Sequence, residues 1–382
     1  MKIVYVIVGL TTGGAEIMLY RILSKINRER FSPSVVCLMD RGTLAERIEA
    51  LGIPVYTLGM KTAGVPTPNV IWKLVNIIRE IKPDLIQGWM YHGNLAAQFT
   101  SLFVGQQIPV FWTIQGTVYS LKLEKKLTAA IIKLSAYLSR FTTKVIHVSQ
   151  VGKIQHEALG YDKKNGCVIF NTVDTSLFVP SEAARADIRA ELGLPENAFM
   201  IGLVCRYHPM KDHANFLQAA AHLLQEYPDI HFALVGTGVV KENESLYQTI
   251  EQLGISHRTH LLGERSEMPR ITAALDIASS ASAYGEGCPL IVGEAMSCGV
   301  PCTVTDVGDS GLIVGNTGWV VPPKNPEALA KAWQESIELG SPGREKLGKA
   351  ARTRIIESFS LDAVVSEYEA LYESVIAKKT GQ

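Results

Sequence analysis

The feature that most constrains this chain is a repeated alternation of short apolar runs with helix-like segments. The run at 2–8 is almost continuously apolar, which is typical of a strand buried in a parallel sheet. In the segment that follows, Ile17, Tyr20 and Leu23 recur at helical spacing. Such alternation with short connections predicts a doubly wound, Rossmann-like α/β domain.

The alternation occurs twice, with one interruption. In the first half we expect strands at 2–8, 33–39, 55–58, 84–88, 110–114, 144–148 and 167–170, and helices at 15–26, 44–51, 69–81, 94–103, 122–138 and 152–159. Residues 171–196 are polar and contain two prolines, so we interpret them as a linker region. The second series predicts strands at 200–206, 230–235, 259–262, 277–280, 302–305 and 319–321, and helices at 213–226, 245–253, 267–274, 326–339 and 344–357.

The last segment, 361–377, is expected to be a helix that packs against another element. It carries one apolar stripe, formed by Leu361, Val364, Val365, Tyr368, Leu371, Tyr372 and Val375. The length of 382 residues favours two domains, each large enough to bury its own core. We predict one domain at 1–172 and a second at 173–359.

Composition narrows the class of protein. No run of eighteen apolar residues occurs, so no membrane-spanning helix is expected, and 1–8 lacks the cleavage site of a signal peptide. The six cysteines include no C-x2-C pair and most lie in apolar runs. We interpret them as reduced thiols rather than disulfides or metal ligands, which indicates a cytoplasmic protein.

Charge is balanced overall but divided unequally between the halves. Of the 37 basic and 37 acidic residues, 20 and 10 lie in 1–172, which leaves 17 and 27 for 173–382. A basic half can meet an anionic membrane surface or a phosphorylated acceptor. The alternative is that this unequal division of charge arises by chance, together with electrostatic attraction between the two halves.

The stretch 283–301 has the pattern of a loop, a helix and a helix end. Pro289 suits the start of a helix, and Gly299 suits its end. The N-terminus of such a helix is a ready anion site. Glu286 lies on the loop beside that end and Glu294 lies on the helix, although glutamates at such positions are often ordinary surface residues.

The whole stretch resembles the Glu-x7-Glu motif of retaining GT-B glycosyltransferases of the family-four (group 1) type. The resemblance extends over nearly the whole chain. It implies a GT-B fold, in which two Rossmann-like domains face each other across a cleft, with 173–359 as the donor domain. It also implies that the final helix, 360–378, completes the N-terminal acceptor domain.

The resemblance implies how 286–294 would hold a nucleotide-sugar. Glu294 would accept hydrogen bonds from the ribose hydroxyls, and Glu286 would lie near the donor sugar. The backbone between them would contact sugar hydroxyls and phosphate; its residues are Gly287, Cys288, Pro289 and Leu290. Members of the family commonly have an aromatic residue at position 288, so Cys288 should reshape the pocket.

Two cations lie at and just after the end of the strand expected at 200–206. Arg206 ends that strand and Lys211 follows five residues later, before a helix. Such residues lie at the carboxyl end of a strand, where α/β folds bind ligands, although a solvated pair would fit as well. The resemblance implies that both hold the donor diphosphate and stabilise the leaving group. With Glu286 they form the predicted catalytic set, and no cofactor or metal is expected, since no D-x-D motif occurs.

The N-terminal half offers further candidates for the site. Gly13 and Gly14 follow the first strand, where the resemblance places a glycine pair beside the cleft, and a simple turn is the alternative. His92 and Asn94 follow the strand at 84–88 and are acceptor-side candidates with Gly13, although a capping histidine would look the same. Gln115 stands where many relatives have a histidine that contacts the donor sugar, and we assign it a binding role with Gly14.

The segment 122–138 and its flanks combine leucines with lysines. Its basic residues, with those just beyond it, are Lys122, Lys125, Lys126, Lys133, Arg140 and Lys144. The pattern is similar to a basic amphipathic membrane surface, but it gives no single basic face, and an ordinary surface helix is the alternative.

These observations predict a retaining, metal-independent hexosyl- or N-acetylhexosaminyltransferase of cell-surface glycan biosynthesis. It would move a sugar from a UDP-sugar to a lipid-linked or polysaccharide acceptor, in the cytoplasm or at the inner membrane face, without a nucleic-acid partner. A sugar-nucleotide epimerase of GT-B fold and a non-catalytic sugar-nucleotide binding protein are the alternatives. Gln115 and Cys288 are the residues that favour the last of these.

Overall fold

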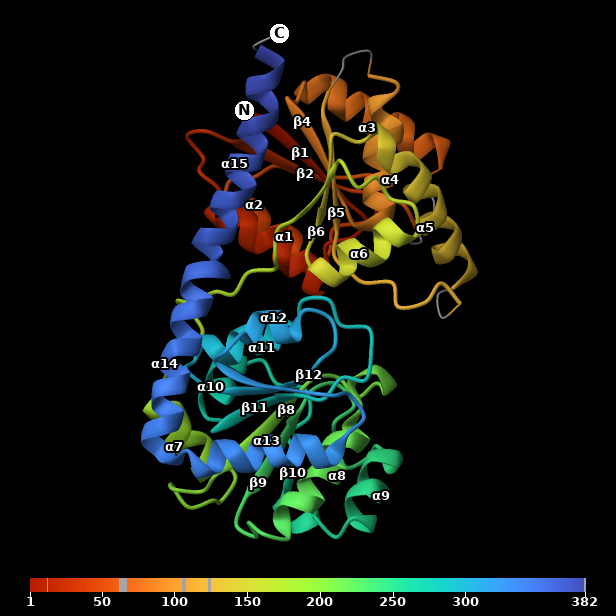
Figure 1. Cartoon of the computed structure of the whole chain (residues 1–382). Coiled ribbons are helices and arrows are strands. Elements are labelled where there is room, and N and C mark those ends of the chain that lie inside the picture. The colour runs from red at the N-terminus through yellow and green to blue at the C-terminus, as the bar shows by residue number, and fades with distance from the viewer. Residues whose placement is uncertain (12, 62–66, 105–107, 123–124, 381–382) are drawn as a thin grey trace. The chain divides into compact units, whose positions relative to one another are not determined.

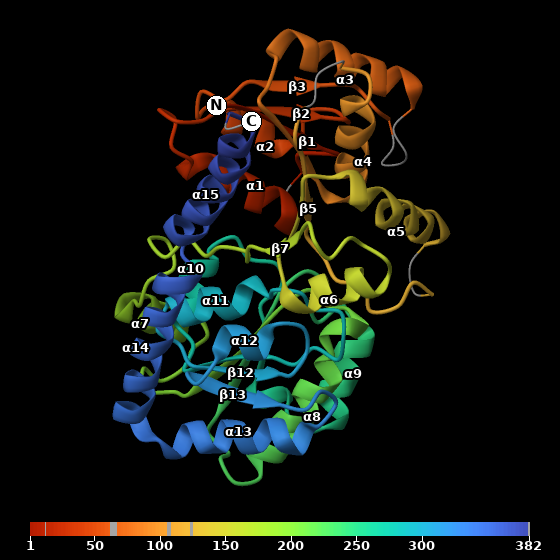
Figure 2. The same cartoon turned by 45° about the horizontal axis from the view of Figure 1, so that its top comes forward.

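The structure is a computed structural model that describes residues 1–11, 13–61, 67–104, 108–122 and 125–380, with the side chains of 375–380 left out. It divides into two compact units (Figures 1 and 2). The first comprises Met1–Asn171 together with Leu361–Gln382, and the second comprises Thr172–Ser360. Each is an α/β unit built on one parallel sheet, as the alternation in the sequence predicts.

The first unit has a seven-stranded sheet in the order β3-β2-β1-β4-β5-β6-β7, with every described pair parallel. Its strands are β1 Lys2–Ile7, β2 Ser32–Cys37, β3 Val55–Thr57, β4 Leu85–Trp89, β5 Val110–Ile114, β6 Lys144–His147 and β7 Gly166–Val168. Its helices are α1 Gly14–Lys25, α2 Thr43–Glu49, α3 Pro68–Ile81, α4 Met90–Ser101, α5 Lys126–Leu138, α6 Gln150–Ala158 and α15 Leu361–Thr380. β1, β4 and β5 are buried almost throughout, which agrees with their largely apolar sequences.

The final helix, α15, belongs to the first unit (Figure 1). Tyr368 and Tyr372, from its apolar stripe, are fully buried, whereas the side chain of Val375 lies outside the described residues. The Tyr372 hydroxyl donates to Gln87 Oε1 at 2.6 Å and lies 3.0 Å from the hydroxyl of Tyr5. Because Tyr372 has a single proton, the Tyr5 hydroxyl is the donor of that second bond.

The second unit has a six-stranded parallel sheet in the order β10-β9-β8-β11-β12-β13. Its strands are β8 Met200–Val204, β9 His231–Val235, β10 Thr259–Leu261, β11 Ile277–Ser280, β12 Cys302–Thr305 and β13 Gly318–Val321. Its helices are α7 Glu182–Glu191, α8 His213–Leu224, α9 Glu244–Gln252, α10 Met268–Ala273, α11 Leu290–Ser297, α12 Ser310–Val314, α13 Pro326–Glu338 and α14 Gly340–Ser358. Phe216, Phe232 and Trp333 pack against one another in edge-to-face and tilted contacts within its core.

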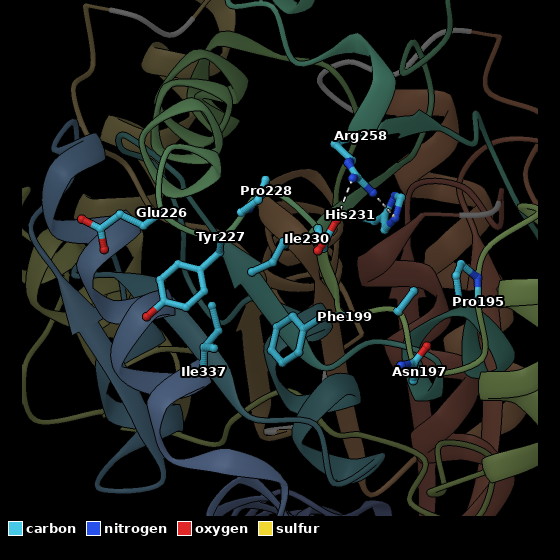
Figure 3. A pocket seen from close by; sticks show the side chains of 12 residues that line it. Pro195, Asn197, Phe199, Glu226, Tyr227, Pro228, Ile230, His231, Arg258 and Ile337 are labelled. Atoms are coloured by element: carbon cyan, nitrogen blue, oxygen red, sulfur yellow. Dashed lines mark hydrogen bonds and ion pairs between the residues drawn. The ribbon is translucent and has the colours of Figure 1, made fainter.

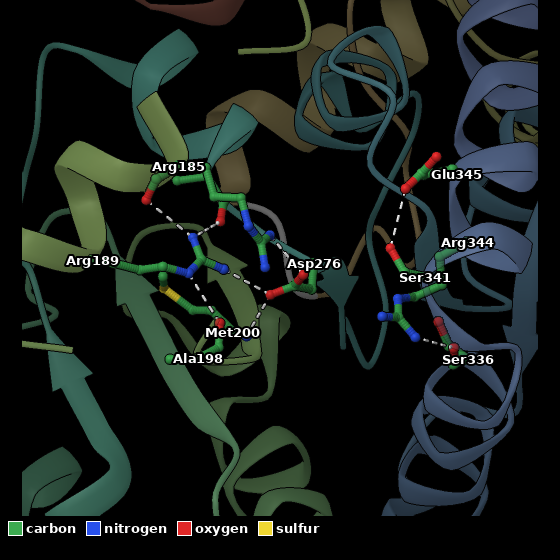
Figure 4. Close-up of polar contacts among 10 residues, drawn as sticks. Arg185, Arg189, Ala198, Met200, Asp276, Ser336, Ser341, Arg344 and Glu345 are labelled. Carbon is green, nitrogen blue, oxygen red and sulfur yellow. Dashed lines mark hydrogen bonds and ion pairs between the residues drawn. The ribbon is translucent and has the colours of Figure 1, made fainter. Parts of the chain in front are cut away.

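The linker prediction for 171–196 is wrong in its middle, because α7 forms there. The Ser181 hydroxyl caps the helix by accepting from Ala184 N, and Arg189 is fully buried although it carries a charge (Figure 4). The Arg189 guanidinium donates to Ala198 O at 3.0 Å and to Ala274 O at 2.9 Å. It also pairs with Asp276 at 2.8 Å, so α7 is bound firmly to the sheet of the second unit.

Other helices also differ from expectation. The short helix α12 was not predicted, because five residues give too little periodicity to recognise. The helix α4 begins at Met90 rather than at 94, directly after β4. Met90 itself has φ of 63°, a left-handed conformation that is uncommon for a side chain of this kind.

Candidate functional site

Each sheet changes the direction of its strand order at one point, and most of the predicted site residues lie beside these points. The change falls between β1 and β4 in the first unit and between β8 and β11 in the second. In open α/β sheets, ligands bind outside the carboxyl ends of the strands at this point. Residues 13–14 and His92 follow β1 and β4. Lys211 and Glu286 follow β8 and β11.

The structure brings Lys211 and Glu286 together. The Lys211 ammonium forms an ion pair with Glu286 Oε1, and the Ser282 hydroxyl donates to the same oxygen at 2.5 Å. The Glu286 side chain is 8% exposed and that of Lys211 is 18% exposed, so water screens the pair weakly. A cation and a carboxylate are therefore held at one end of this sheet by segments 75 residues apart in the sequence.

Close backbone contacts hold the Glu286 loop in place. The amide of Ala283 donates to Met210 O at 2.8 Å, and the amide of Asp309 donates to Gly287 O at 2.9 Å. Gly308 has φ of 63°, and a Cβ at this position would collide with the carbonyl of Glu286. The loop is thus packed against both neighbouring segments, which fixes the position of the Glu286 carboxylate.

The helix α11 begins directly after this loop. Pro289 is its N-cap and Leu290 is its first residue, so the free N–H groups of its first turn start beside Cys288 and Gly287. Cys288 is half-buried. Glu294 is partly exposed on the helix, and its charge, after burial itself, helps to raise the pKa of the Cys298 thiol to about 12.

Arg206 is more exposed to solvent than the ion pair of Lys211 and Glu286. The sequence predicts Arg206 as the last residue of β8, but the strand ends at Val204, and the Arg206 side chain is exposed. The backbone at Arg206 packs closely against Gly236, because a Cβ at position 236 would collide with Cys205 O and lie 2.9 Å from Arg206 N. The guanidinium is consequently a surface cation with room to reach a ligand, whereas the Lys211 ammonium is already paired.

The glycine pair of the first unit lies at the start of α1. Gly13 is the N-cap, and a Cβ there would collide with the carboxylate of Glu16. Gly14 is exposed, and a Cβ built on it would meet no atom of the described chain within 4 Å. Because the Glu16 side chain is flexible and could move aside, packing requires a glycine at neither position, and the exposed Gly14 leaves the helix terminus accessible to a ligand.

His92, Asn94 and Gln115 have different environments. His92 is half-buried in the first turn of α4, and burial lowers its pKa. Asn94 is buried and uses both ends of its amide on the backbone of Thr113, each at 3.2 Å, which favours a structural role. Gln115 directly follows β5, and its buried Nε2 has no hydrogen-bond partner among the residues the structure describes. Such an unpaired donor is suited to a ligand oxygen.

A large cavity of the second unit lies at the opposite, amino-terminal ends of the strands, where β9 and β10 begin (Figure 3). It has a volume of about 550 Å³, and none of the predicted site residues lines it. Arg258 Nη1 donates to His231 Nε2 at 3.0 Å, so His231 carries its proton on Nδ1 and donates to His260 Nε2 at 3.1 Å. Burial is the main reason that the pKa of His231 falls to about 4, which keeps its imidazole neutral beside the Arg258 guanidinium.

In the described part of the chain, no group of three His, Cys, Asp or Glu side chains could hold a metal ion. The same residues include no helix that is long and apolar enough to span a bilayer.

Comparison with known proteins gives matches along both units. The model of glycosyl transferases group 1 matches residues 184–354, and the model of glycosyltransferase family 4 matches residues 12–177. A UDP-Gal:alpha-D-GlcNAc-diphosphoundecaprenol alpha-1,3-galactosyltransferase of Escherichia coli is 24% identical over 366 residues, which cover 92% of this chain and 91% of the relative. A D-inositol 3-phosphate glycosyltransferase of Corynebacterium urealyticum is 32% identical over 186 residues, covering 45% and 43%.

Solved structures resemble the whole fold. The crystal structure of Anabaena Alr3699/HepE in complex with UDP has a TM-score of 0.84 at 23% identity. It covers 98% of this chain and all of that one. The two parallel sheets of this chain therefore form the GT-B fold.

Proposed function

Because this chain belongs to the group 1 glycosyltransferases, we propose that it is a retaining enzyme that transfers a hexose or N-acetylhexosamine from a UDP-sugar. The observation that carries the proposal is the Lys211–Glu286 pair at the point where the sheet of the second unit changes direction. Cleavage of a sugar–diphosphate bond leaves negative charge on the β-phosphate. Fixed cations and helix N–H groups stabilise that charge without reorganising.

Each donor contact has a candidate in the second unit. Lys211 and Arg206 would bind the diphosphate, and the first amides of α11 would add their dipole. Glu294 would accept hydrogen bonds from the ribose, and Glu286 would hold Lys211 in place and contact the sugar. In the first unit, Gly14 and Gln115 are the donor-binding candidates, because one leaves a helix terminus open and the other has an unpaired amide within the described residues.

We propose a lipid-linked or polysaccharide acceptor for the first unit. The Escherichia coli relative, which matches this chain over most of its length, acts on a sugar linked to diphosphoundecaprenol. Gly13 and His92 remain the acceptor-side candidates of the sequence, since both lie beside the carboxyl ends of β1 and β4. Transfer would then serve the synthesis of a cell-surface glycan.

Release of UDP from a panel of UDP-sugars tests the proposal. We expect UDP release with at least one UDP-sugar, at a faster rate when an octyl glycoside or a polyprenyl diphosphate sugar is added. NMR of the product should show that the anomeric configuration of the donor is retained. EDTA should leave the rate within about twofold, because the proposed leaving-group stabilisation uses Lys211, Arg206 and backbone amides. An isomerised UDP-sugar would indicate an epimerase, and binding without turnover across the panel would indicate a binding protein.

We further propose that α5 and its C-terminal flank contact an anionic lipid surface. Four large apolar side chains are exposed at helical spacing, namely Leu127 at 54%, Leu134 at 42%, Tyr137 at 56% and Phe141 at 61%. Lys126, Lys133 and Arg140 are exposed one position before three of them, and 125–144 contains no acidic residue. A row of cations beside an apolar row suits acyl chains and lipid phosphates together.

Vesicle sedimentation tests the lipid contact. The protein should bind vesicles of phosphatidylglycerol and phosphatidylcholine, and replacing Lys126, Lys133 and Arg140 with glutamine should weaken binding by roughly 100-fold, at about 1 kcal/mol per charge. A matched variant with glutamine at the exposed Lys324, Lys331 and Lys346 of the second unit should bind as the unaltered protein does. Equal binding by both variants would refute the assignment of this surface.

A further inference from the structure

A cluster of two histidines and two tyrosines lies at the carboxyl edge of the first unit's sheet, outside the set of predicted site residues. Tyr91 follows β4, His147 ends β6, His156 lies on α6 and Tyr161 follows that helix. The rings are in mutual contact, with centroids of 4.9 Å for His156–Tyr161, 5.3 Å for His147–His156 and 5.8 Å for Tyr91–His156. His147, His156 and Tyr161 are buried, whereas Tyr91 is partly exposed.

The hydrogen bonds of the cluster determine where its protons lie. His156 Nδ1 lies 2.6 Å from the carbonyl oxygen of Gly152, and a carbonyl can only accept. His156 therefore carries its proton on Nδ1, and its Nε2 is a bare acceptor. The Tyr91 hydroxyl lies 2.7 Å from that Nε2 and must donate to it. The single proton of Tyr91 is thus directed at His156, so toward any other group the Tyr91 oxygen can only accept.

The surrounding backbone fixes this arrangement. The Ser149 hydroxyl caps α6 by accepting from Gly152 N at 2.9 Å, which sets the carbonyl that binds His156. Gln155 Oε1, from the next turn, accepts from Val118 N at 3.0 Å and ties the loop after β5 to α6. Met90, the residue before Tyr91, has a left-handed backbone conformation, which sets the direction of the chain at this point. Strained residues of this kind cluster at functional sites.

The cluster also keeps His156 uncharged. Burial lowers the pKa of His156, and burial together with the neighbouring His156 and Lys153 lowers the pKa of His147 to about 3. A protonated His156 would donate to Tyr91 and reverse the direction of the bond. With both rings neutral, the Tyr91 oxygen is a fixed hydrogen-bond acceptor.

We propose that Tyr91 binds a hydroxyl group of the sugar acceptor, with His156 as the positioning residue that directs the Tyr91 lone pairs toward it. This inference rests on the proposed glycosyltransferase function, which requires an acceptor at the carboxyl edge of the first unit. The chemistry selects a ligand group that donates a hydrogen bond, such as a sugar hydroxyl or an acetamido N–H. A carboxylate or phosphate has no proton to offer and would be disfavoured at this position.

The variant Tyr91→Phe tests the role with minimal change of shape. With the octyl glycoside or polyprenyl diphosphate sugar that the unaltered enzyme uses fastest, we expect the acceptor KM to rise about 10-fold, the loss expected for one hydrogen bond. The KM for the UDP-sugar and the rate of UDP release without acceptor should stay within about twofold. His156→Phe should raise the acceptor KM in the same way, and His156→Gln, which again offers an acceptor oxygen, should restore part of the loss.

Tyr161→Phe is the matched control, because it removes a hydroxyl from the same cluster without removing the bond to His156. Its acceptor KM should be unchanged. An acceptor KM for Tyr91→Phe equal to that of the unaltered enzyme would overturn the acceptor role while leaving the proposed function intact. Absence of UDP release by the unaltered enzyme would overturn the proposed function and the acceptor role with it.

Discussion

Replacing Lys211 with glutamine should lower the rate of sugar transfer by roughly 100- to 1,000-fold, the effect of removing one fixed electrostatic contact from a transition state. The ammonium group lies at the carboxyl end of β8 and is held by Glu286, which itself accepts from Ser282. The loss should appear in kcat as well as in kcat/KM for the UDP-sugar, because charge develops on the leaving phosphate only as the bond breaks. Steady-state release of UDP measures both quantities.

Glutamine is preferable to alanine for this experiment. Its amide can donate to the Glu286 carboxylate, so the buried carboxylate keeps a hydrogen-bond partner and the unit should fold. Lys241→Gln, an exposed position of the same unit with the same change of charge, is the control and should retain full activity. If Lys211→Gln retained more than a tenth of the transfer rate, Lys211 would have no direct part in bond cleavage.

Replacing Asp276 with alanine should destabilise the second unit by about 3–5 kcal/mol, because it leaves a buried guanidinium without a counter-charge. Asp276 accepts from Arg189 at 2.8 Å, from Arg185 at 2.6 Å and from the amide of Met200 at 2.8 Å (Figure 4). The Arg189 side chain is only 1% exposed, so water cannot replace the lost carboxylate. For a unit of this size the melting temperature should fall by roughly 10 °C, which calorimetry can measure.

The control for Asp276 lies on α7 itself. Glu191 pairs with Arg265 and Arg270, but its side chain is 38% exposed. Glu191→Ala removes the same charge from a solvated network and should cost less than about 1 kcal/mol. Equal losses from the two variants would mean that burial of Arg189 contributes nothing to the stability of this unit.

The sequence was most informative where one physical rule decided the structure. The bounds of β5, β11 and β12 agree with those predicted, because all three are short, uncharged runs that the parallel sheet buries. The helix α7 was missed because its sequence is polar and its binding to the sheet depends on Arg189, a residue that is exposed in most proteins. Hydrophobic periodicity indicates only the burial of apolar side chains. It cannot reveal a buried charge whose partner, Asp276, lies 87 residues away.

For the candidate site, too, the positions of residues along the chain could be predicted, but the contacts between their side chains could not. Spacing and the resemblance placed Lys211 and Glu286 at strand ends, but no pattern in the sequence indicates that they pair with each other. The engagement of Asn94 with Thr113 was equally hidden, since a buried amide and a ligand-binding amide look alike in a sequence. Tyr91 and His156 lie 65 positions apart, and the direction of their hydrogen bond depends on the carbonyl of Gly152, which only coordinates reveal.

The placement of α15 has a consequence for the order in which the chain folds during synthesis. Residues 172–360 are contiguous, so the second unit can complete its core while the last residues are still being made. The first unit cannot, because Gln87 Oε1 and the hydroxyl of Tyr5 lack their contact with Tyr372 until that residue has left the ribosome. The earlier half of the chain would therefore mature last, and a truncation after Ser360 should expose an unfinished N-terminal unit to chaperones and proteases while sparing the second.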